Sequence, residues 1–263
     1  MKILFLGGDR RMITAYNILK NEHEVSSLGL FPNDDGNISA ADAIVLPVPA
    51  TRDGDTVNCP LTNKKIPLRL LDTLTRGTHI ITYGHKFSHY PQTDYSSLDD
   101  FCIKNAVLTA EGAIAYAIDS TERAIFKSRI LIVGFGRVGK ALFSRLMGFG
   151  ADITVSARKP HDLALAESLG ANTVKTEYVA EKAHDYDIIF NTADLPIFED
   201  PATLGKALLI DLSTSGCIDL AAAEKFGIKA VKLPSVPAKT APVSAGEIIA
   251  DTVSKILTEN QKY

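Results

Sequence analysis

The chain has 263 residues, of which 46% are hydrophobic and 22% are charged, and its formal net charge is −3. These values are typical of a globular protein with a buried core, and the length fits two domains of ordinary size. Lysine and arginine are scattered along the chain, which argues against binding to nucleic acid. The three cysteines are far apart, and no apolar run reaches the roughly 18 residues of a membrane span, so we expect no metal site, no membrane contact and a cytoplasmic location.

The first half of the chain alternates between strand-like and helix-like segments. Residues 2–6 form a short apolar run that ends at Gly7, and an apolar stripe at helical spacing follows over residues 12–19. Short, continuously apolar runs suit parallel strands that are buried on both faces. Further strands are predicted at residues 24–28, 43–48, 79–82 and 105–108.

A second helical stripe joins the two halves. It includes Ala110, Ala113, Ile114 and Ala117, which recur at the spacing of one helix face. We predict a long connecting helix over residues 109–127.

The second half repeats the pattern of the first. Arg129–Val133 is an apolar run that ends at Gly134, and an amphipathic segment follows it. Ser244 and Glu247 have the spacing of a capping box, which predicts a final helix over residues 244–263 that returns to the first domain. The remaining strands are predicted at residues 152–156, 173–175, 187–191, 207–212 and 229–233.

Strands that alternate with helices indicate an α/β fold with parallel sheets. We predict two doubly wound, Rossmann-like domains. Residues 1–108, rejoined by the helix at 244–263, would form an N-terminal substrate and catalytic domain. Residues 109–127 would be the connecting helix, and residues 128–243 the NAD(P)-binding domain.

The turn after residues 129–133 has the spacing of a dinucleotide-binding fingerprint. Gly134, Gly136 and Gly139 form a G-x-G-x-x-G pattern between an apolar strand and an amphipathic helix, with Arg137 and Val138 inside it. The first glycine permits the tight turn, the second admits the pyrophosphate, and the third lets the helix pack on the strand. These five residues are predicted to bind the cofactor.

The end of the next strand bears on the choice between NAD and NADP. NAD-binding proteins usually carry an acidic residue there, but this chain has Ser156 and Ala157 at that place, followed by Arg158 and Lys159. A guanidinium in place of a carboxylate suits the 2′-phosphate of NADP. We therefore predict Ser156 and Arg158 as cofactor contacts and NADP as the cofactor, with NAD possible. The alternative is that Arg158 and Lys159 are ordinary charges of an exposed loop.

Polar residues also follow two later strands. Asn191, Thr192 and Asp211 come at the carboxyl ends of the predicted strands at 187–191 and 207–212. Open α/β sheets bind their ligands beyond these ends, so contacts with the nicotinamide ribose are predicted. Ordinary capping of the strand ends is the alternative.

The strand ends of the first half collect charged residues. Asp9, Arg10, Arg11 and Arg52 are predicted to form a pocket for a small anionic substrate, since guanidinium groups bind carboxylates in a bidentate manner. Two further titratable residues, His85 and Glu111, follow the predicted strands at 79–82 and 105–108.

Several of these segments together resemble a known family. Gly7–Arg10, residues 42–49 and Thr109–Gly112 are similar to segments of the A subunit of bacterial spore dipicolinate synthase, as are Val133–Gly139 and residues 237–246. The resemblance extends over nearly the whole chain.

The resemblance implies NAD(P)-dependent oxidation of a dihydrodipicolinate-level precursor to pyridine-2,6-dicarboxylate during sporulation. It implies that the partner is a flavoprotein-like B subunit, that the protein lies in the mother cell, and that its fold is like that of hydroxyacid and alanine dehydrogenases. A homo-oligomer is compatible with it.

For that reaction, the arginines would hold the substrate carboxylates, and Glu111 or His85 would accept the proton. The alternatives are a carboxylate that only stabilises a helix start, a loop histidine, and solvated arginines.

Two other functions stay open at this point. The first is a different NADP-dependent dehydrogenase, acting on an amino acid or a hydroxyacid, which would need a well-placed histidine or lysine base. The second is a non-catalytic NADP-binding component of a complex.

Overall fold

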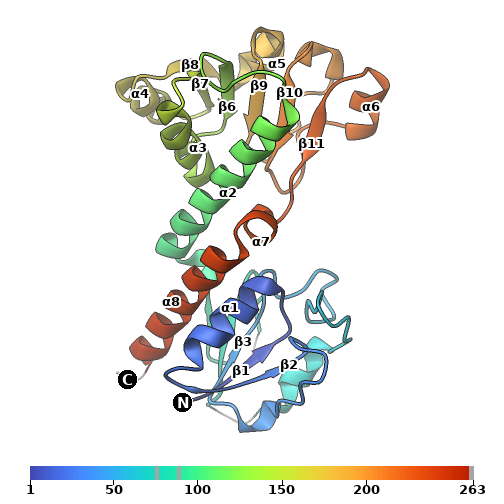
Figure 1. Cartoon of the computed structure of the whole chain (residues 1–263), viewed down its shortest axis with the longest axis vertical. Coiled ribbons are helices and arrows are strands. Elements are labelled where there is room, and N and C mark those ends of the chain that lie inside the picture. The colour runs from blue at the N-terminus through green and yellow to red at the C-terminus, as the bar shows by residue number, and fades with distance from the viewer. Residues whose placement is uncertain (75–76, 88–89, 261–263) are drawn as a thin grey trace. The chain divides into compact units, whose positions relative to one another are not determined.

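The computed structural model describes residues 1–74, 77–87 and 90–260. The chain forms two compact units (Figure 1). The first consists of Met1–Asn105 with Pro237–Tyr263, and the second of Ala106–Val236. Each unit contains a parallel sheet with helices packed against it, which confirms the predicted α/β fold class. The first unit ends three residues before the predicted 108, and the second ends seven residues before the predicted 243. Residue 127, the predicted end of a separate connecting helix, lies inside the second unit.

The first unit has a five-stranded sheet in the order β2-β1-β3-β4-β5. Every neighbouring pair is parallel, and Ile3 of β1 pairs with Val25 on one side and Ala43 on the other. This strand order reverses between β1 and β3, and doubly wound sheets bind ligands at such a reversal. The strands are β1 (Lys2–Leu6), β2 (Glu24–Leu28), β3 (Ala43–Val45), β4 (His79–Thr82) and β5 (Gln92–Asp94).

The two faces of this sheet are covered differently. On one face α1 (Arg10–Leu19) and α8 (Pro242–Asn260) lie side by side (Figure 1), so close that a Cβ on Gly246 would collide with Thr14. The other face is covered by loops and by the short 3-10 helices η1 (Ile38–Ala40) and η2 (Leu68–Thr73). The unit also contains η3 (Tyr95–Ser97) and all of α7 (Val236–Thr240) except its first residue.

Helix α2 (Asp99–Ser120) begins in the first unit and ends in the second. The predicted strand at 105–108 is therefore wrong, and the helix starts ten residues earlier than the predicted 109. The three-residue apolar run at 106–108 does not distinguish a strand from part of a helix, and here the run continues an alanine-rich helical stripe. By length and composition α2 could cross a membrane, but its residues Ala110, Ala113, Ile114 and Ala117 are packed in the core of the second unit.

The second unit has a six-stranded sheet in the order β11-β10-β9-β6-β7-β8, with every neighbouring pair parallel. This is the dinucleotide-binding order 3-2-1-4-5-6, and it reverses between β6 and β9. The strands are β6 (Arg129–Val133), β7 (Asp152–Ala157), β8 (Asn172–Lys175), β9 (Ile188–Asn191), β10 (Leu208–Asp211) and β11 (Ala230–Lys232).

Helices connect the strands of this sheet. Amphipathic α3 follows β6 and buries Leu142, Phe143 and Leu146 against it. The connecting helices are α3 (Arg137–Gly148), α4 (Pro160–Ser168), α5 (Val179–Lys182) and α6 (Leu220–Lys225), with the 3-10 turns η4 (Thr176–Tyr178), η5 (Ala183–Asp185) and η6 (Pro201–Leu204).

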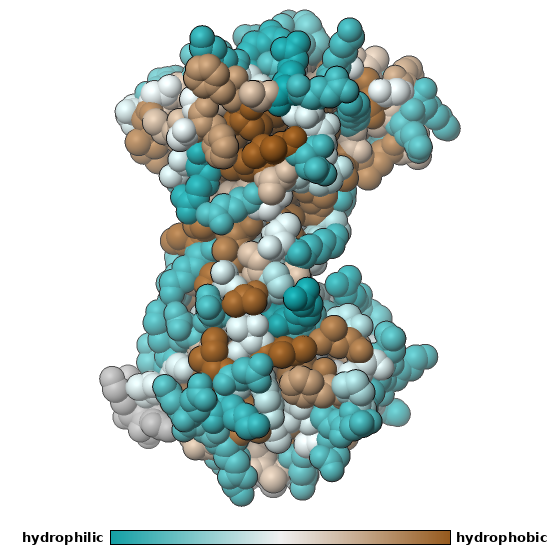
Figure 2. All heavy atoms as spheres, viewed as in Figure 1, coloured by the Kyte–Doolittle hydropathy of each residue, from teal (hydrophilic) through white to brown (hydrophobic). Residues whose placement is uncertain are grey.

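The last helix, α8, begins at Pro242, so Ser244 lies inside it and the predicted capping box is wrong. Proline is well suited to the first turn of a helix because its missing N–H has no partner there anyway. The space-filling view shows hydrophilic side chains over most of the visible surface of each unit, with hydrophobic side chains gathered in smaller areas (Figure 2).

Candidate active site

The glycine-rich turn of the second unit has the geometry that its sequence predicts. Gly134 has φ +95°, a conformation that favours glycine, and Gly136 caps α3 with open space around it. A Cβ on Gly139 would collide with the carbonyl oxygen of Gly134, so only glycine lets α3 approach β6 this closely. The start of α3 therefore has open space beside Gly136, and the backbone amides of a helix start are the groups that receive a pyrophosphate.

Thr192 supports this turn from the neighbouring strand. Its Oγ1 donates a hydrogen bond to the carbonyl of Val133 at 2.9 Å, and a Cβ built on Gly134 would come within 2.6 Å of that oxygen. Gly134 follows β6 and Thr192 follows β9, and the strand order reverses between these two strands. Thr192, predicted as a cofactor contact, thus also fixes the backbone of the glycine turn.

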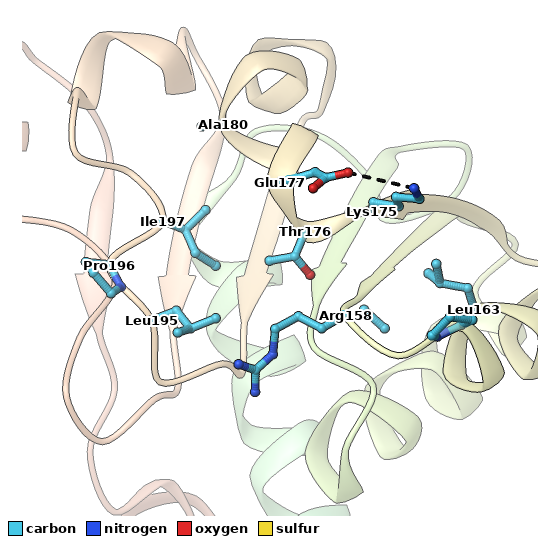
Figure 3. Close-up of a pocket in the computed structure, with 11 residues that line it drawn as sticks. Arg158, Leu163, Lys175, Thr176, Glu177, Ala180, Leu195, Pro196 and Ile197 are labelled. Carbon is cyan, nitrogen blue, oxygen red and sulfur yellow. Dashed lines mark ion pairs between the residues drawn. The ribbon is translucent and has the colours of Figure 1, made fainter.

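A cavity of about 680 Å³ opens beyond the carboxyl ends of β7 and β8. Its wall is mostly apolar, with Leu163 on one side and Leu195 and Ile197 on the other (Figure 3). Arg158 lies at one end, and the ion pair between Lys175 and Glu177, at 3.8 Å, lies at the other. The cavity is large enough for an adenosine group, and an apolar wall is suitable for a flat base.

The residues predicted to read the ribose differ in accessibility. Ser156 is fully buried in β7, and its Oγ donates to Thr176 at 3.2 Å. Ala157 ends the strand, and Arg158 is exposed. Ala157 thus stands at the strand end where a carboxylate would repel a 2′-phosphate, and Arg158 places a guanidinium on the wall of the cavity beside it.

Asn191 and Asp211 form a buried pair at the ends of β9 and β10. Asn191 Nδ2 donates to Asp211 Oδ1 at 2.8 Å, and the carboxylate also accepts from the Ser213 backbone N–H at 3.0 Å and from the Cys217 backbone N–H at 3.1 Å. Both side chains are at most 1% exposed. In this structure they hold the loop 213–217. This is the capping of strand ends that the sequence analysis gave as the alternative to a contact with the cofactor.

In the first unit, Asp9 and Arg11 form a partly buried ion pair. Asp9 caps α1, and the Arg11 guanidinium, whose side chain is 6% exposed, donates to both of its carboxylate oxygens. The same guanidinium also donates to the carbonyl of Val48 in the loop after β3. Arg11 thereby ties the ends of β1 and β3 together at the reversal of the sheet.

Arg52 and Arg10 are exposed guanidinium groups at the same edge. Arg52 Nε donates to Asn58 Oδ1 at 3.3 Å, and the backbone oxygen of Asn58 accepts from the Gly8 backbone N–H at 2.9 Å. Arg10 is the first residue of α1 and is exposed. Among the described residues, no partner for its guanidinium is found. Arg10 and Arg52 are therefore accessible to an anion at this edge.

His85 and Glu111 belong to different units. His85 is half-buried after β4, packs edge-on against Phe87, and lines a cavity of about 450 Å³ together with Asp55, Arg69 and Asp72. Glu111 lies within α2 rather than after a strand, and its Oε1 is 3.1 Å from the Nε of Arg145 on α3. The two residues therefore have different surroundings.

Several residues that shape these edges were not predicted from the sequence. Tyr95 is fully buried and donates to the carbonyl of Leu46 at 2.9 Å, and burial raises the pKa of its hydroxyl. Asp194 accepts hydrogen bonds from the backbone of Ser215 and Thr214, which lower its pKa despite partial desolvation. Each has an ordinary residue type in an ordinary pattern, so no local signal distinguished it.

Two family models match the two units. Residues 2–86 match the model of the N-terminal domain of the dipicolinate synthase A subunit, and residues 107–196 match "D-isomer specific 2-hydroxyacid dehydrogenase, NAD binding domain". The chain is 30% identical, over 99% of its length and 97% of the relative, to the A subunit of dipicolinate synthase from Bacillus subtilis (strain 168). This chain belongs to the family of dipicolinate synthase A subunits. The prediction from the sequence motifs is thereby confirmed.

Solved structures of this family are similar over the whole chain. The dipicolinate synthase A subunit of Bacillus subtilis matches with a TM-score of 0.87 and 28% identity, covering 100% of this chain and 97% of that one. Its counterpart from Bacillus halodurans matches with a TM-score of 0.86 and 26% identity, covering 97% of each chain. A transhydrogenase of Sinorhizobium meliloti, at a TM-score of 0.66 and 16% identity, shares the fold, covering 97% of this chain and 93% of that one.

Family membership has two consequences. The family combines its own N-terminal domain with a dehydrogenase-type NAD-binding domain, so this chain is a nicotinamide-dependent oxidoreductase. Because its members are one component of a synthase with more than one kind of chain, this chain also has a partner subunit.

Proposed function

We propose that the chain oxidises a dihydrodipicolinate-level precursor to pyridine-2,6-dicarboxylate. The observation that carries this proposal is family membership over 99% of the chain, together with accessible guanidinium groups at the ligand-binding edge of the first unit. The reaction removes a hydride from a ring carbon and a proton from the ring, and the product is aromatic. The nicotinamide cofactor supplies the hydride acceptor.

In this proposal the protein binds and orients the substrate. Arg10 and Arg52 bind its carboxylates, because both are exposed at the reversal of the sheet in the first unit. Asp9 and Arg11 act indirectly, since their ion pair fixes the loop after β3 from which Arg52 extends. Such positioning contributes to rate without any further chemistry from the protein.

His85 or Glu111 accepts the proton. His85 is partly accessible and has no ionic partner among the described residues, whereas Glu111 shares its carboxylate with Arg145. An imidazole without an ionic partner can accept a proton from a bound substrate. We therefore expect His85→Ala to lower kcat more than Glu111→Gln does. Equal kcat values for the two variants would leave His85 without this role.

NADP is the proposed cofactor, with NAD as the alternative. Arg158 lies in the cavity next to Ala157, where an NAD-binding chain would usually carry an acidic residue. We expect Arg158→Ala to weaken NADPH binding at least about tenfold and to leave NADH binding nearly unchanged, because only NADPH carries the 2′-phosphate. Ala157→Asp should reverse the preference. Titration of each reduced cofactor by its fluorescence measures both.

The reaction is tested with the purified chain, freshly generated precursor and either cofactor, with and without the second subunit. The proposal predicts dipicolinate and reduced cofactor in equal amounts. If the chain binds the cofactor but forms no dipicolinate in any combination, the assignment of substrate is wrong. We place the activity in the cytoplasm of the mother cell of a sporulating bacterium, where the partner is a flavoprotein-like B subunit.

A hydroxyacid or amino-acid dehydrogenase would need a well-placed histidine or lysine base, and the second unit gives little support for one. Both histidines of that unit, His161 and His184, are exposed and have acidic neighbours at 3.5 Å. Lys232 Nζ donates to the carbonyl of Thr214 at 2.6 Å, which holds it in a structural contact. A panel of 2-hydroxyacids and amino acids in the same assay discriminates between these functions.

A further inference from the structure

The second unit has a large cationic groove at the edge of its sheet opposite the glycine turn. A groove of about 880 Å³ runs along the amino-terminal ends of the strands. Arg129 begins β6, Asp187 precedes β9, and Lys229 precedes β11, while Leu208 begins β10 between the last two. The carboxyl ends of the same strands carry the cofactor turn. A ligand in this groove therefore leaves the cofactor site accessible.

Positive charge predominates in the groove. Its cations come from four separate segments: Arg123 after α2, Arg129 on β6, Lys206 before β10 and Lys229 before β11. The carboxylates that line it are those of Glu122 and Asp187. His184, which also lines it, adds positive charge when protonated.

The close carboxylate of Asp187 does not neutralise these cations. Asp187 is partly desolvated, which raises its pKa, but hydrogen bonds and charge from Arg129, with the charge of Arg123, lower the pKa overall. Its contacts with the two arginines are long, at 4.0 Å to Arg123 Nη1 and 3.5 Å to Arg129 Nε. Pairs of this kind are weak, since the side chains of Arg123 and Arg129 are 76% and 54% exposed. The cations remain available to a further anion.

We propose that this groove binds an acidic segment of the partner subunit. The groove is large, and its cations are spread over neighbouring strands, which suits an extended segment that carries several carboxylates. A single small dianion would instead be held by arginines that are buried and close together. Exposed charges on the rim of an interface mainly accelerate association and make it dependent on salt. The inference rests on the chain being one component of a two-component enzyme, but not on the identity of its substrate.

Binding of the full-length chain to the second subunit tests the proposal. We expect the association rate of the unmodified chain to fall steeply between low salt and about 0.15 M salt, where charges are screened beyond about 8 Å. Lys206→Glu/Lys229→Glu should weaken binding at least about tenfold, mainly through slower association. Lys65→Glu is the control, because it reverses an exposed charge of the first unit, outside this groove.

Two measurements separate the proposal from a general loss of folding or of cofactor binding. Circular dichroism and NADPH binding should be the same for the double variant and the unmodified chain, since both altered lysines are exposed and lie at the opposite edge from the glycine turn. Binding of the second subunit is measured without turnover. The result therefore holds even if the chain forms no dipicolinate and the proposed reaction is wrong. Unchanged binding by the double variant, or no binding of the second subunit by the unmodified chain, overturns the proposal. The proposal is also overturned if the double variant no longer binds dipicolinate but still binds the second subunit, because the groove would then be a site for a small dianion.

Discussion

Asn191 Nδ2 donates a 2.8 Å hydrogen bond to Asp211 Oδ1, and this bond joins the carboxyl ends of the neighbouring strands β9 and β10. Asp211 is 1% exposed, and it also accepts a 2.7 Å hydrogen bond from Ser213 Oγ. The pair fixes the strand ends and loop at the cofactor edge of the second unit.

Loss of this pair should destabilise the fold more than it impairs cofactor binding. We expect Asp211→Ala to lower the free energy of unfolding by about 2–3 kcal/mol, because it leaves buried donors without a partner. Urea denaturation measures the effect. In a double-mutant cycle with Asn191→Ala, the two changes should be less than additive by about 1 kcal/mol. Full additivity would mean that the hydrogen bond contributes nothing.

The close approach of α3 to β6 gives a prediction with a matched control. Gly139→Ala places a Cβ against the carbonyl of Gly134, so we expect a loss of about 1–3 kcal/mol in stability and weaker NADPH binding. Gly148→Ala lies at the other end of α3 with nothing within 4 Å of the added Cβ. It should be neutral or slightly stabilising. If both variants bind NADPH equally, the glycine turn is not the cofactor site.

Because of Asp34, the free energy of unfolding should vary with pH in the acidic range. Burial raises its pKa, but hydrogen bonds from Lys64 and from the backbone of Phe31, Gly29 and Leu30 outweigh this and lower the pKa from 3.8 to about 2. A carboxylate with a depressed pKa stabilises the fold above its unfolded pKa and loses that contribution as the pH falls through the folded one.

We therefore predict that Asp34→Asn costs about 2 kcal/mol at neutral pH. The difference from the unmodified chain should shrink as the pH falls from 3.8 towards 2. Thermal unfolding over that range checks both points. Asp35→Asn, an exposed neighbour, is the control. A difference that does not change with pH would contradict the assignment to the carboxylate.

Arg10 and Arg52 should contribute to substrate binding. We expect Arg10→Ala and Arg52→Ala each to lower kcat/KM by about tenfold or more, which corresponds to at least about 1.4 kcal/mol for a carboxylate contact. Lys20→Ala removes a cation from the other end of α1 and should have no such effect. Arg10→Ala with unchanged kcat/KM would exclude that residue from the substrate site.

The local features of the fold were predictable from sequence, whereas long-range contacts were not. The Gly134–Gly139 turn and its flanking strand and helix follow from spacing and apolarity, because each residue acts on its immediate neighbours. Strand β5 (Gln92–Asp94) was missed because it is polar and lies at the edge of the sheet. A contact such as Arg52 to Asn58, or Arg11 to Val48, depends on how the loops fold back and has no signature in the residue pattern.

In the candidate site, too, local features were predictable from the sequence and long-range contacts were not. The sequence placed Arg158 directly after a strand, where the structure has it. It could not show that Asn191 and Asp211 are buried and paired with each other. It also placed Glu111 at the start of a helix, directly after a strand, where the structure has the middle of α2. A three-residue apolar run, such as the one at 106–108, carries too little information to decide between a strand and a helix.

The most direct test of the proposed reaction is to follow the hydride. The precursor is prepared with deuterium on its saturated ring carbons and incubated with the chain, the cofactor and the second subunit. Direct transfer predicts one deuterium at C4 of the reduced nicotinamide, detected by NMR and mass spectrometry. Dipicolinate formed with an unlabelled nicotinamide would contradict the proposed reaction, because the hydride would then have left the substrate by another route.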